Sequence, residues 1–213
     1  MNLGEIKIQT LILMRAHVEN GPQDICVADL PSLMGTEAYG EYLIGMTGAI
    51  NRCFSDIENK RALPTRAFVL PLAEGVAGYV RYDLSRLLPD FRETDSVVYS
   101  ASDGTYRSDV PYRAEGGVLS LPAIDTSCEA YTLIYRPQIA RVTSFTDDGV
   151  EIDVPDNIAQ LIPYFLKSEL YREDEVSEAE KARVFYEQGM AAVRNSRERY
   201  QGSVENIYVS EAW

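Results

Sequence analysis

The sequence predicts a mixed α+β protein, in which a four-helix bundle is interrupted by an inserted β-sandwich or barrel-like domain and followed by an extended C-terminal tail. Two observations carry this prediction. Toward both ends of the 213-residue chain, apolar residues recur every three or four positions, as in amphipathic helices. In the middle third the period changes to two, and glycine-containing turns separate short runs, which is typical of β-hairpins.

Residues 1–63 predict two helices that form the first half of the bundle. The first spans 3–18, and its apolar side is made of Leu3, Ile8, Leu11, Ile12 and Ala16. The second runs from a cap at Thr36 to about Arg61, and Gly45 and Gly48 within it predict close approach by another backbone. Its apolar side steps by four and three residues in turn, through Tyr39, Leu43, Met46, Ile50, Cys53 and Ile57.

Residues 64–154 predict the β domain. The runs "RAFVLPL" and "GYVRYDL" are typical of strands, and Asp103-Gly104 and Gly116-Gly117 are typical of hairpin turns. In "EAYTLIYRP", alternation places Tyr131, Leu133 and Tyr135 on one face. Because the flanking helices need each other to bury their apolar sides, we expect an insertion whose two ends lie close together.

Helical spacing returns over residues 155–198, the second half of the bundle. Pro155 suits a first turn, whereas Pro163 is predicted to kink a continuous helix in its middle. The apolar stripe of this helix is Ile158, Leu161, Ile162, Phe165, Leu166 and Leu170. A capping box formed by Ser177 and Glu180 predicts a last helix to about Arg197, with a closely packed face made of Ala182, Tyr186, Gly189 and Val193.

Residues 199–213 show no clear period and are predicted to extend away from the bundle. Ile207, Tyr208, Val209 and Trp213 are too few to build a core, yet they are costly to leave in water. We therefore expect a partner to cover these four residues, with the two aromatic side chains as anchors.

The charge balance argues against nucleic-acid binding. With 33 acidic and 20 basic residues the formal net charge is −13, so an electrostatic grip on phosphates is not expected. Two interpretations of the acidity stay open, namely solubility and an acidic surface that repels DNA sliding past it. No apolar run reaches the length of a membrane span and no secretion signal opens the chain, so we expect a cytosolic origin and no membrane.

Few residues offer catalytic or metal-binding chemistry. His17 is the only histidine, and Cys26, Cys53 and Cys128 are too far apart in sequence to form a zinc motif. The acidic group Asp147, Asp148, Glu151, Asp153 and Asp156 is interpreted as a solvated turn rather than a cation site, because it does not fit the EF-hand pattern. Phosphate-binding loops and nucleophile elbows are absent, so we expect no enzyme activity, metal or organic cofactor.

The order of elements, together with "PDNIAQLIPYFLKSELYREDE" and "KARVFYEQGMAAVRNSRE", resembles the head-tail adaptor (connector) proteins of tailed bacteriophages. The resemblance spans nearly the whole chain. It implies a structural virion protein made in the host cytoplasm and located in the neck of the particle. It also implies a ring of copies, usually twelve, that binds the portal protein, presents a platform to a downstream tail or neck protein and lets DNA pass without specific binding.

A binding module is the alternative function. The chain has 14 tyrosines, and seven of them in the predicted β domain are suited to stacking on sugars or peptides: Tyr79, Tyr82, Tyr99, Tyr106, Tyr112, Tyr131 and Tyr135. Tyrosine is equally a common strand residue, half buried with its hydroxyl in water. A carbohydrate- or receptor-binding β module of a phage tail would be the function in the first case.

Overall fold

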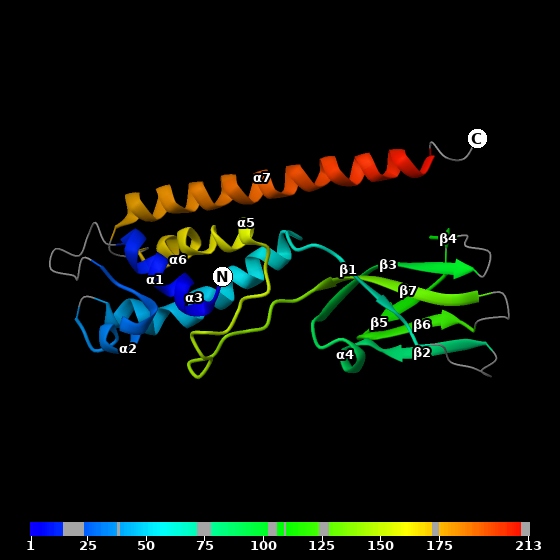
Figure 1. Cartoon of the computed structure of the whole chain (residues 1–213), viewed down its shortest axis with the longest axis horizontal. Coiled ribbons are helices and arrows are strands. Elements are labelled where there is room, and N and C mark those ends of the chain that lie inside the picture. Colours follow the sequence, from blue (N-terminus) through cyan, green and yellow to red (C-terminus); the bar gives the residue numbers. More distant parts are fainter. Residues whose placement is uncertain are drawn as a thin grey trace. The chain divides into compact units, whose positions relative to one another are not determined.

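The computed structural model describes residues 1–14, 24–37, 39–71, 78–101, 106–108, 110–123, 128–171 and 175–209, without side chains at 100–107, 128–129 and 197–209. His17, Trp213 and the Asp103-Gly104 turn lie outside the described residues. The chain divides into two compact units (Figure 1). The helical unit comprises Met1–Ala62 and Ala140–Trp213, and the β unit comprises Leu63–Ile139.

Helices from both ends of the chain build the helical unit, as predicted. The first part contains α1 (Leu3–Met14), the 3-10 turn η2 (Val27–Asp29), α2 (Leu30–Leu33) and α3 (Gly40–Asn59). The second part contains α5 (Asp156–Ala159), α6 (Ile162–Leu170) and α7 (Val176–Val209). Helix α6 packs against α1, α3 and α7, and its Ile162 and Leu166 are fully buried. The second part of the chain therefore supplies the core against which the first part folds.

The apolar side predicted for the second helix is confirmed, since all six of its residues are buried, five of them in α3 and Tyr39 as its N-cap. Its start is different, because α3 begins at Gly40, and the Thr36 hydroxyl accepts a hydrogen bond from the backbone N–H of Tyr39 in the preceding turn. The glycine prediction is wrong in detail. A Cβ at Gly45 would meet the Leu170 side chain rather than a backbone, and one at Gly48 would meet only the end of an arginine side chain.

In α1 the prediction for Ile12 is wrong. Leu3, Ile8 and Leu11 are buried as expected, but Ile12 is 44% exposed. Ile6 and Met14 are buried instead. The buried side of α1 is therefore turned toward positions 6, 10 and 14, where helices packed around it need apolar contacts.

The kinked helix predicted around Pro163 is instead two helices. Helix α5 ends at Ala159, and α6 begins at Ile162 with Pro163 in its first turn. A proline at that position costs no helical hydrogen bond, because the first N–H groups of a helix have no partner within it. The break between α5 and α6 thus avoids the energetic cost of a proline inside a helix. Pro155 is the N-cap of α5 rather than part of its first turn.

The prediction of an extended tail is wrong for residues 199–209. Helix α7 continues to Val209 and is 34 residues long. It begins at Val176, so Ser177 is already inside the helix rather than capping it. Its packed face is as predicted: Ala182, Tyr186 and Val193 are buried, and a Cβ at Gly189 would lie 2.5 Å from Leu161 Cδ2.

Two antiparallel sheets form the β unit. One has the order β1-β7-β3-β4, with strands Arg66–Val69, Cys128–Pro137, Phe91–Ala101 and Tyr106–Arg107. The other has the order β2-β6-β5, with strands Tyr79–Asp83, Val118–Pro122 and Arg113–Glu115. The short helix α4 (Leu84–Leu87) follows β2. Gly116 and Gly117 have positive φ angles of 57° and 79° and form the predicted turn between β5 and β6.

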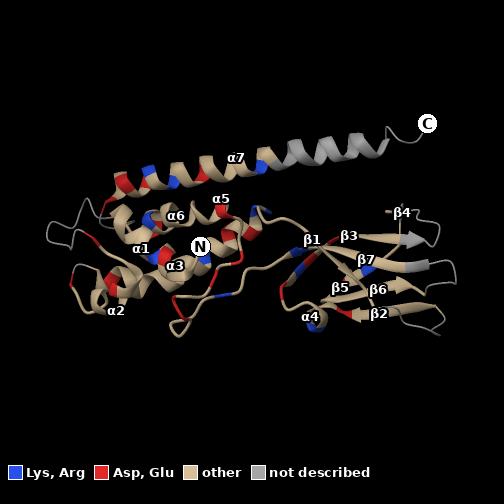
Figure 2. Cartoon of the chain, viewed as in Figure 1, with Lys and Arg blue, Asp and Glu red and all other residues tan. Residues whose placement is uncertain are grey.

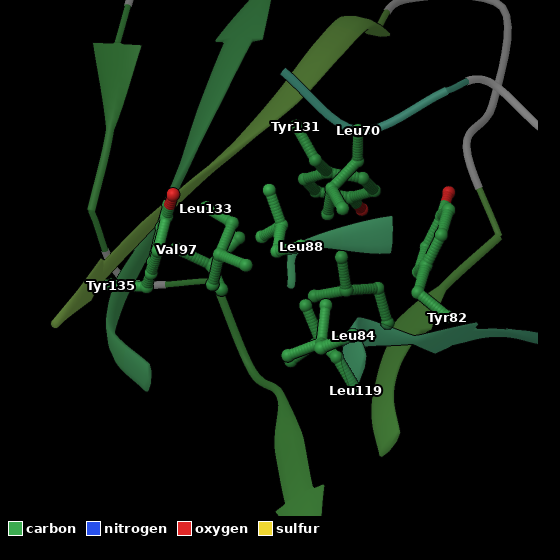
Figure 3. Packing of buried hydrophobic residues seen from close by; sticks show 10 residues of the cluster. Leu70, Tyr82, Leu84, Leu88, Val97, Leu119, Tyr131, Leu133 and Tyr135 are labelled. Atoms are coloured by element: carbon green, nitrogen blue, oxygen red, sulfur yellow. The ribbon is translucent and has the colours of Figure 1, made fainter. Parts of the chain in front are cut away.

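One hydrophobic cluster joins the two sheets. It includes Val97 and Leu133 from the first sheet and Leu119 from the second, with Leu84 and Leu88 between them. Figure 3 shows these side chains meeting between the strands, with Tyr82 and Tyr135 at the sides of the cluster. Tyr131, Leu133 and Tyr135 share the buried face that alternation predicted. Among the described strands neither sheet closes on itself, so the barrel-like alternative is wrong.

The strands that begin and end the β unit are neighbours. Strand β1 pairs with β7, and Arg66 lies opposite Tyr135. These paired strands bring together the two ends of the observed unit, which ends at Ile139 and not at residue 154. The closeness of the ends predicted at residues 64 and 154 stays a prediction.

Residues 140–154 belong to the helical unit because they satisfy the N-terminus of α1. The first N–H groups of a helix lack partners within it. Leu3 N–H donates to the carbonyl of Val150 and Gly4 N–H to the carbonyl of Asp148. Asn2 also forms a β-bridge with Glu151. No sequence period marks such contacts, so the boundary was placed too late.

Within the described part of the chain, no helix combines the length and the hydropathy that crossing a bilayer requires.

Substitution of Gly40 tests the tight turn before α3. A Cβ at Gly40 would lie 2.7 Å from the carbonyl oxygen of Met34, so we expect Gly40→Ala to lower the free energy of unfolding by about 1–3 kcal/mol. Urea denaturation measures the change. Gly48→Ala is the matched control, because its Cβ meets only the end of the Arg52 side chain and alanine favours a helix by up to ~1 kcal/mol. Equal effects of the two substitutions would contradict the proposed contact.

Candidate interaction site

The residues predicted to bind a partner lie at the end of α7. Ile207, Tyr208 and Val209 are the last three residues of the helix, and Trp213 is outside the described residues. Three of the four predicted residues therefore follow one another on a helix and not on an extended segment. The first half of α7 is fixed to the helical unit by polar and aromatic contacts.

A polar cluster centred on Asp56 fixes α7 to α3. The Asp56 carboxylate accepts a hydrogen bond of 2.7 Å from the Tyr186 hydroxyl and one of 2.5 Å from Lys60 Nζ. Lys60 also pairs with Glu187, and Arg183 lies 3.0 Å from the Glu187 carboxylate. Asp56 and Lys60 belong to α3 and its C-cap, whereas Arg183, Tyr186 and Glu187 belong to α7. The cluster therefore holds two helices together through residues that are 127 and 130 positions apart in sequence.

Aromatic side chains complete the contact between α6 and α7. Tyr164 stacks on Phe185 with ring centroids 4.2 Å apart, and Phe165 meets Tyr186 edge-on at 5.1 Å. The Arg183 guanidinium lies 4.8 Å from the centre of the Phe165 ring. Consecutive aromatic pairs on each helix thus fix the register of α7 against α6.

Burial changes the ionisation of the groups beneath α7. Removal from water raises the pKa of the Tyr186 hydroxyl, and the nearby Cys53 and Asp56 raise it further. Burial and Asp56 likewise raise the pKa of the Cys53 thiol. Both groups stay protonated at neutral pH, so neither is an activated nucleophile. At the start of α7, hydrogen bonds from Lys181 and Lys167 lower the pKa of Glu178 to about 2.

The acidic segment 147–156 is used for structural contacts. The Asp148 carboxylate pairs with Lys7 at 2.6 Å, and Glu151 pairs with the N-terminal ammonium at 3.2 Å. Asp147 accepts a hydrogen bond from the Gly149 N–H within its own turn. Across the described residues, no three or more His, Cys, Asp or Glu side chains are placed to share a metal ion. Of the cysteines, Cys53 is buried and Cys26 is exposed.

An apolar groove opens on the helical unit beside α7. It is a cleft of about 410 Å³ whose apolar lining consists of Ile12, Leu13, Leu161, Pro163, Tyr164 and Phe185. Sequence reasoning missed this groove. Ile12 was assigned to the core, and Phe185 falls outside the face predicted for the last helix. Only the packing of α1, α6 and α7 brings these residues together.

The tyrosines of the β unit do not form one stacking surface. Tyr82, Tyr131 and Tyr135 are buried, and their hydroxyl groups donate to Pro71, Pro122 and Asp90 respectively. Tyr79 and Tyr112 are exposed, but they lie outside this cluster. The side chain of Tyr106 lies outside the description.

Comparison with known proteins gives no relative: no protein-family model matches the chain, and no curated protein matches it.

Removal of the Asp56 carboxylate tests how much the polar cluster contributes to stability. We expect Asp56→Ala to lower the free energy of unfolding by about 1–3 kcal/mol, because Lys60 and Tyr186 would lose a partly buried acceptor. Thermal or urea unfolding measures this change. Glu115→Ala is the control, since it breaks an exposed pair with Arg113 and should leave stability unchanged within error. A neutral Asp56→Ala would show that α7 is held by apolar contacts alone.

The raised pKa values of Cys53 and Tyr186 predict a loss of stability in alkali. As the pH rises past ~9 to 10, these groups ionise in the unfolded chain first, so the free energy of unfolding should fall with increasing pH. We expect Tyr186→Phe to reduce the slope of this fall, measured by urea denaturation from pH 7 to pH 11. Tyr79→Phe, at an exposed ring, is the comparison variant. An unchanged slope for Tyr186→Phe would contradict the assignment.

Proposed function

We propose that this chain is a structural virion protein of the phage neck, a head-tail adaptor subunit that joins the portal to the tail. In this proposal copies form a ring, of twelve in the related case, that extends the DNA channel and meets a downstream tail or neck protein. The support is the resemblance stated above, together with the observed order of elements. Helices from both ends of the chain form one unit, and a β unit is inserted between them.

The observation that carries the proposal is the length of α7. At 1.5 Å per residue, its 34 residues span about 51 Å. Of the α7 side chains that the structure describes, Val193 is the last one that is buried. The helix continues for 16 residues beyond it, or about 24 Å. We propose that this part of the helix reaches another subunit.

Sequence spacing supports a binding face on this part of α7. The buried residues Ala179, Tyr186 and Val193 follow one another at intervals of seven. Tyr200 and Ile207 continue the same interval along the same helix. Positions seven residues apart lie on nearly the same side of a helix, so the face that packs inside the unit is repeated beyond it. We propose that the portal or a neighbouring copy covers this repeat, with Ile207, Tyr208, Val209 and Trp213 at its end.

The finer architecture belongs to the same proposal. The contacts of α6 with α1, α3 and α7 support a helical bundle, and the shared cluster of the two sheets supports a β-sandwich inserted into it. We place the protein in the virion neck after synthesis in the host cytoplasm. In this role we expect no enzyme activity and no metal or organic cofactor.

Passage of DNA through the ring is supported by the net charge of −13 alone. Acidic and basic residues alternate along the described part of α7 (Figure 2), so this helix does not present a face of a single sign. The alternative, a carbohydrate- or receptor-binding module, has less support because three of the seven candidate tyrosines are buried.

Removal of the end of α7 tests the proposed function. We expect a chain lacking residues 202–213 to keep its fold, because the anchored half of α7 remains, and to lose joining to portal-bearing heads. Co-sedimentation with such heads measures joining, and circular dichroism checks the fold. A full-length variant with Ile207→Asp and Tyr208→Asp should behave in the same way, whereas Glu205→Gln should join normally.

Normal co-sedimentation of both the truncated chain and the double variant would contradict the docking role of α7.

A further inference from the structure

Phe145 is an aromatic side chain presented to solvent by a fixed turn. It is 94% exposed, the highest value among the large apolar residues that the structure describes. The Thr143 hydroxyl accepts a hydrogen bond from the Phe145 N–H, and the Thr146 hydroxyl accepts one from the Thr143 N–H. The Thr146 N–H in turn donates to the Thr143 carbonyl. These bonds define the shape of the turn, which we call the Phe145 turn, residues 143–146.

The Phe145 turn is tied to the helical unit on both sides. Before it, the Asn51 side chain of α3 brackets the backbone of Val142, accepting from its N–H and donating to its carbonyl. After it, Asp148 pairs with Lys7 and accepts the Gly4 N–H through its carbonyl. Because the backbone of the turn is already fixed, binding through Phe145 orders only its side-chain torsions, which favours its use as an interface anchor.

The apolar groove matches the Phe145 side chain in polarity. Ile12 and Phe185 are 44% and 50% exposed, so apolar surface faces solvent at this site. A cavity of ~150 Å³ already accommodates benzene, and the groove of about 410 Å³ is larger. Its polar lining residues are Gln9, Asn157 and Gln160, so among the residues that the structure describes neither an acidic nor a basic one lines it.

The net charge of the chain bears on which partner can contact the Phe145 turn and the groove. The chain is strongly acidic, so two copies repel each other wherever like charges meet. The Phe145 turn has the sequence Thr-Ser-Phe-Thr and carries no charge, and the described residues that line the groove carry none either. The amide side chains at the groove offer hydrogen bonds to the turn's hydroxyl groups. The two patches themselves therefore add no charged side chain to the repulsion between acidic copies.

We propose that Phe145 of one copy inserts into the apolar groove of a second copy of this chain. The turn, coloured yellow-green, lies on the opposite side of the helical unit from α7 (Figure 1), whereas the groove lies beside α7. The two surfaces are different patches of one unit, so the contact is head-to-tail and propagates into a ring or a filament. The inference rests on the proposed assembly of copies, for which it supplies the interface.

Sedimentation velocity of the purified full chain over increasing concentration tests the contact. We expect the average mass to rise with concentration, and Phe145→Ala to weaken self-association about thirtyfold or more, as for a central anchor residue. Phe145 is exposed, so its replacement leaves the fold intact. Val176→Ala is the matched control at another exposed apolar residue of the helical unit, and it should associate like the unmodified chain.

A mixing experiment tests the head-to-tail geometry. Phe145→Ala lacks the anchor but keeps the groove, and Ile12→Glu blocks the groove but keeps the anchor. We expect each variant alone to stay monomeric and an equimolar mixture to form heterodimers and nothing larger. A mass that does not rise with concentration, self-association unchanged by Phe145→Ala, or a mixture without heterodimers would overturn the inference.

The test is separate from that of the proposed function, because it uses the purified chain and no portal-bearing heads. Loss of association in Phe145→Ala together with normal joining of the unmodified chain would support both proposals. If the unmodified chain associates through Phe145 but fails to join heads, the adaptor function is wrong and the interface stands.

Discussion

The burial of α6 is the constraint on which the helical unit depends. This nine-residue helix contacts α1, α3 and α7, and its Ile162, Phe165 and Leu166 lie in the core between them. A helix of that length is not stable in water by propensity alone. Helix α6 therefore depends on helices from both ends of the chain for its stability. The β unit lies between those ends in the sequence, and its first and last strands pair with each other.

The same packing sets the direction of α7. The aromatic pairs with α6 and the Asp56 cluster on α3 fix its first half in position and register. Because a helix is stiff, the position of the first half of α7 also sets the direction of its second half. In the proposed function, a partner-binding end on this helix would need less ordering than a flexible tail, which favours affinity. The Asp56 cluster and the aromatic pairs thus set the direction of the long helix α7.

Periodicity predicted the elements well where one neighbour decides burial. The six apolar positions of α3 and its N-cap and the alternating face of β7 are buried as predicted, since each depends only on which side of the element faces the core. Periodicity was wrong where several neighbours compete. Ile12 lines a groove together with residues of α5, α6 and α7 and is not covered by them. Pro163 begins a helix because a break at Gln160 costs less than a proline inside one.

The sequence by itself determined the α+β composition, the insertion of a β unit between helical ends and the apolar faces of the long elements, because these follow from spacing along the chain. Only the tertiary structure decided where the β unit ends and which exposed residues form surfaces. The carbonyls of Asp148 and Val150 satisfy the N-terminus of α1, a pairing between residues more than 140 positions apart. In the sequence, Phe145 is a single aromatic residue in a polar run. Its exposure is set by hydrogen bonds of its turn and by anchors on α1 and α3, and contacts between such distant segments leave no period in the sequence.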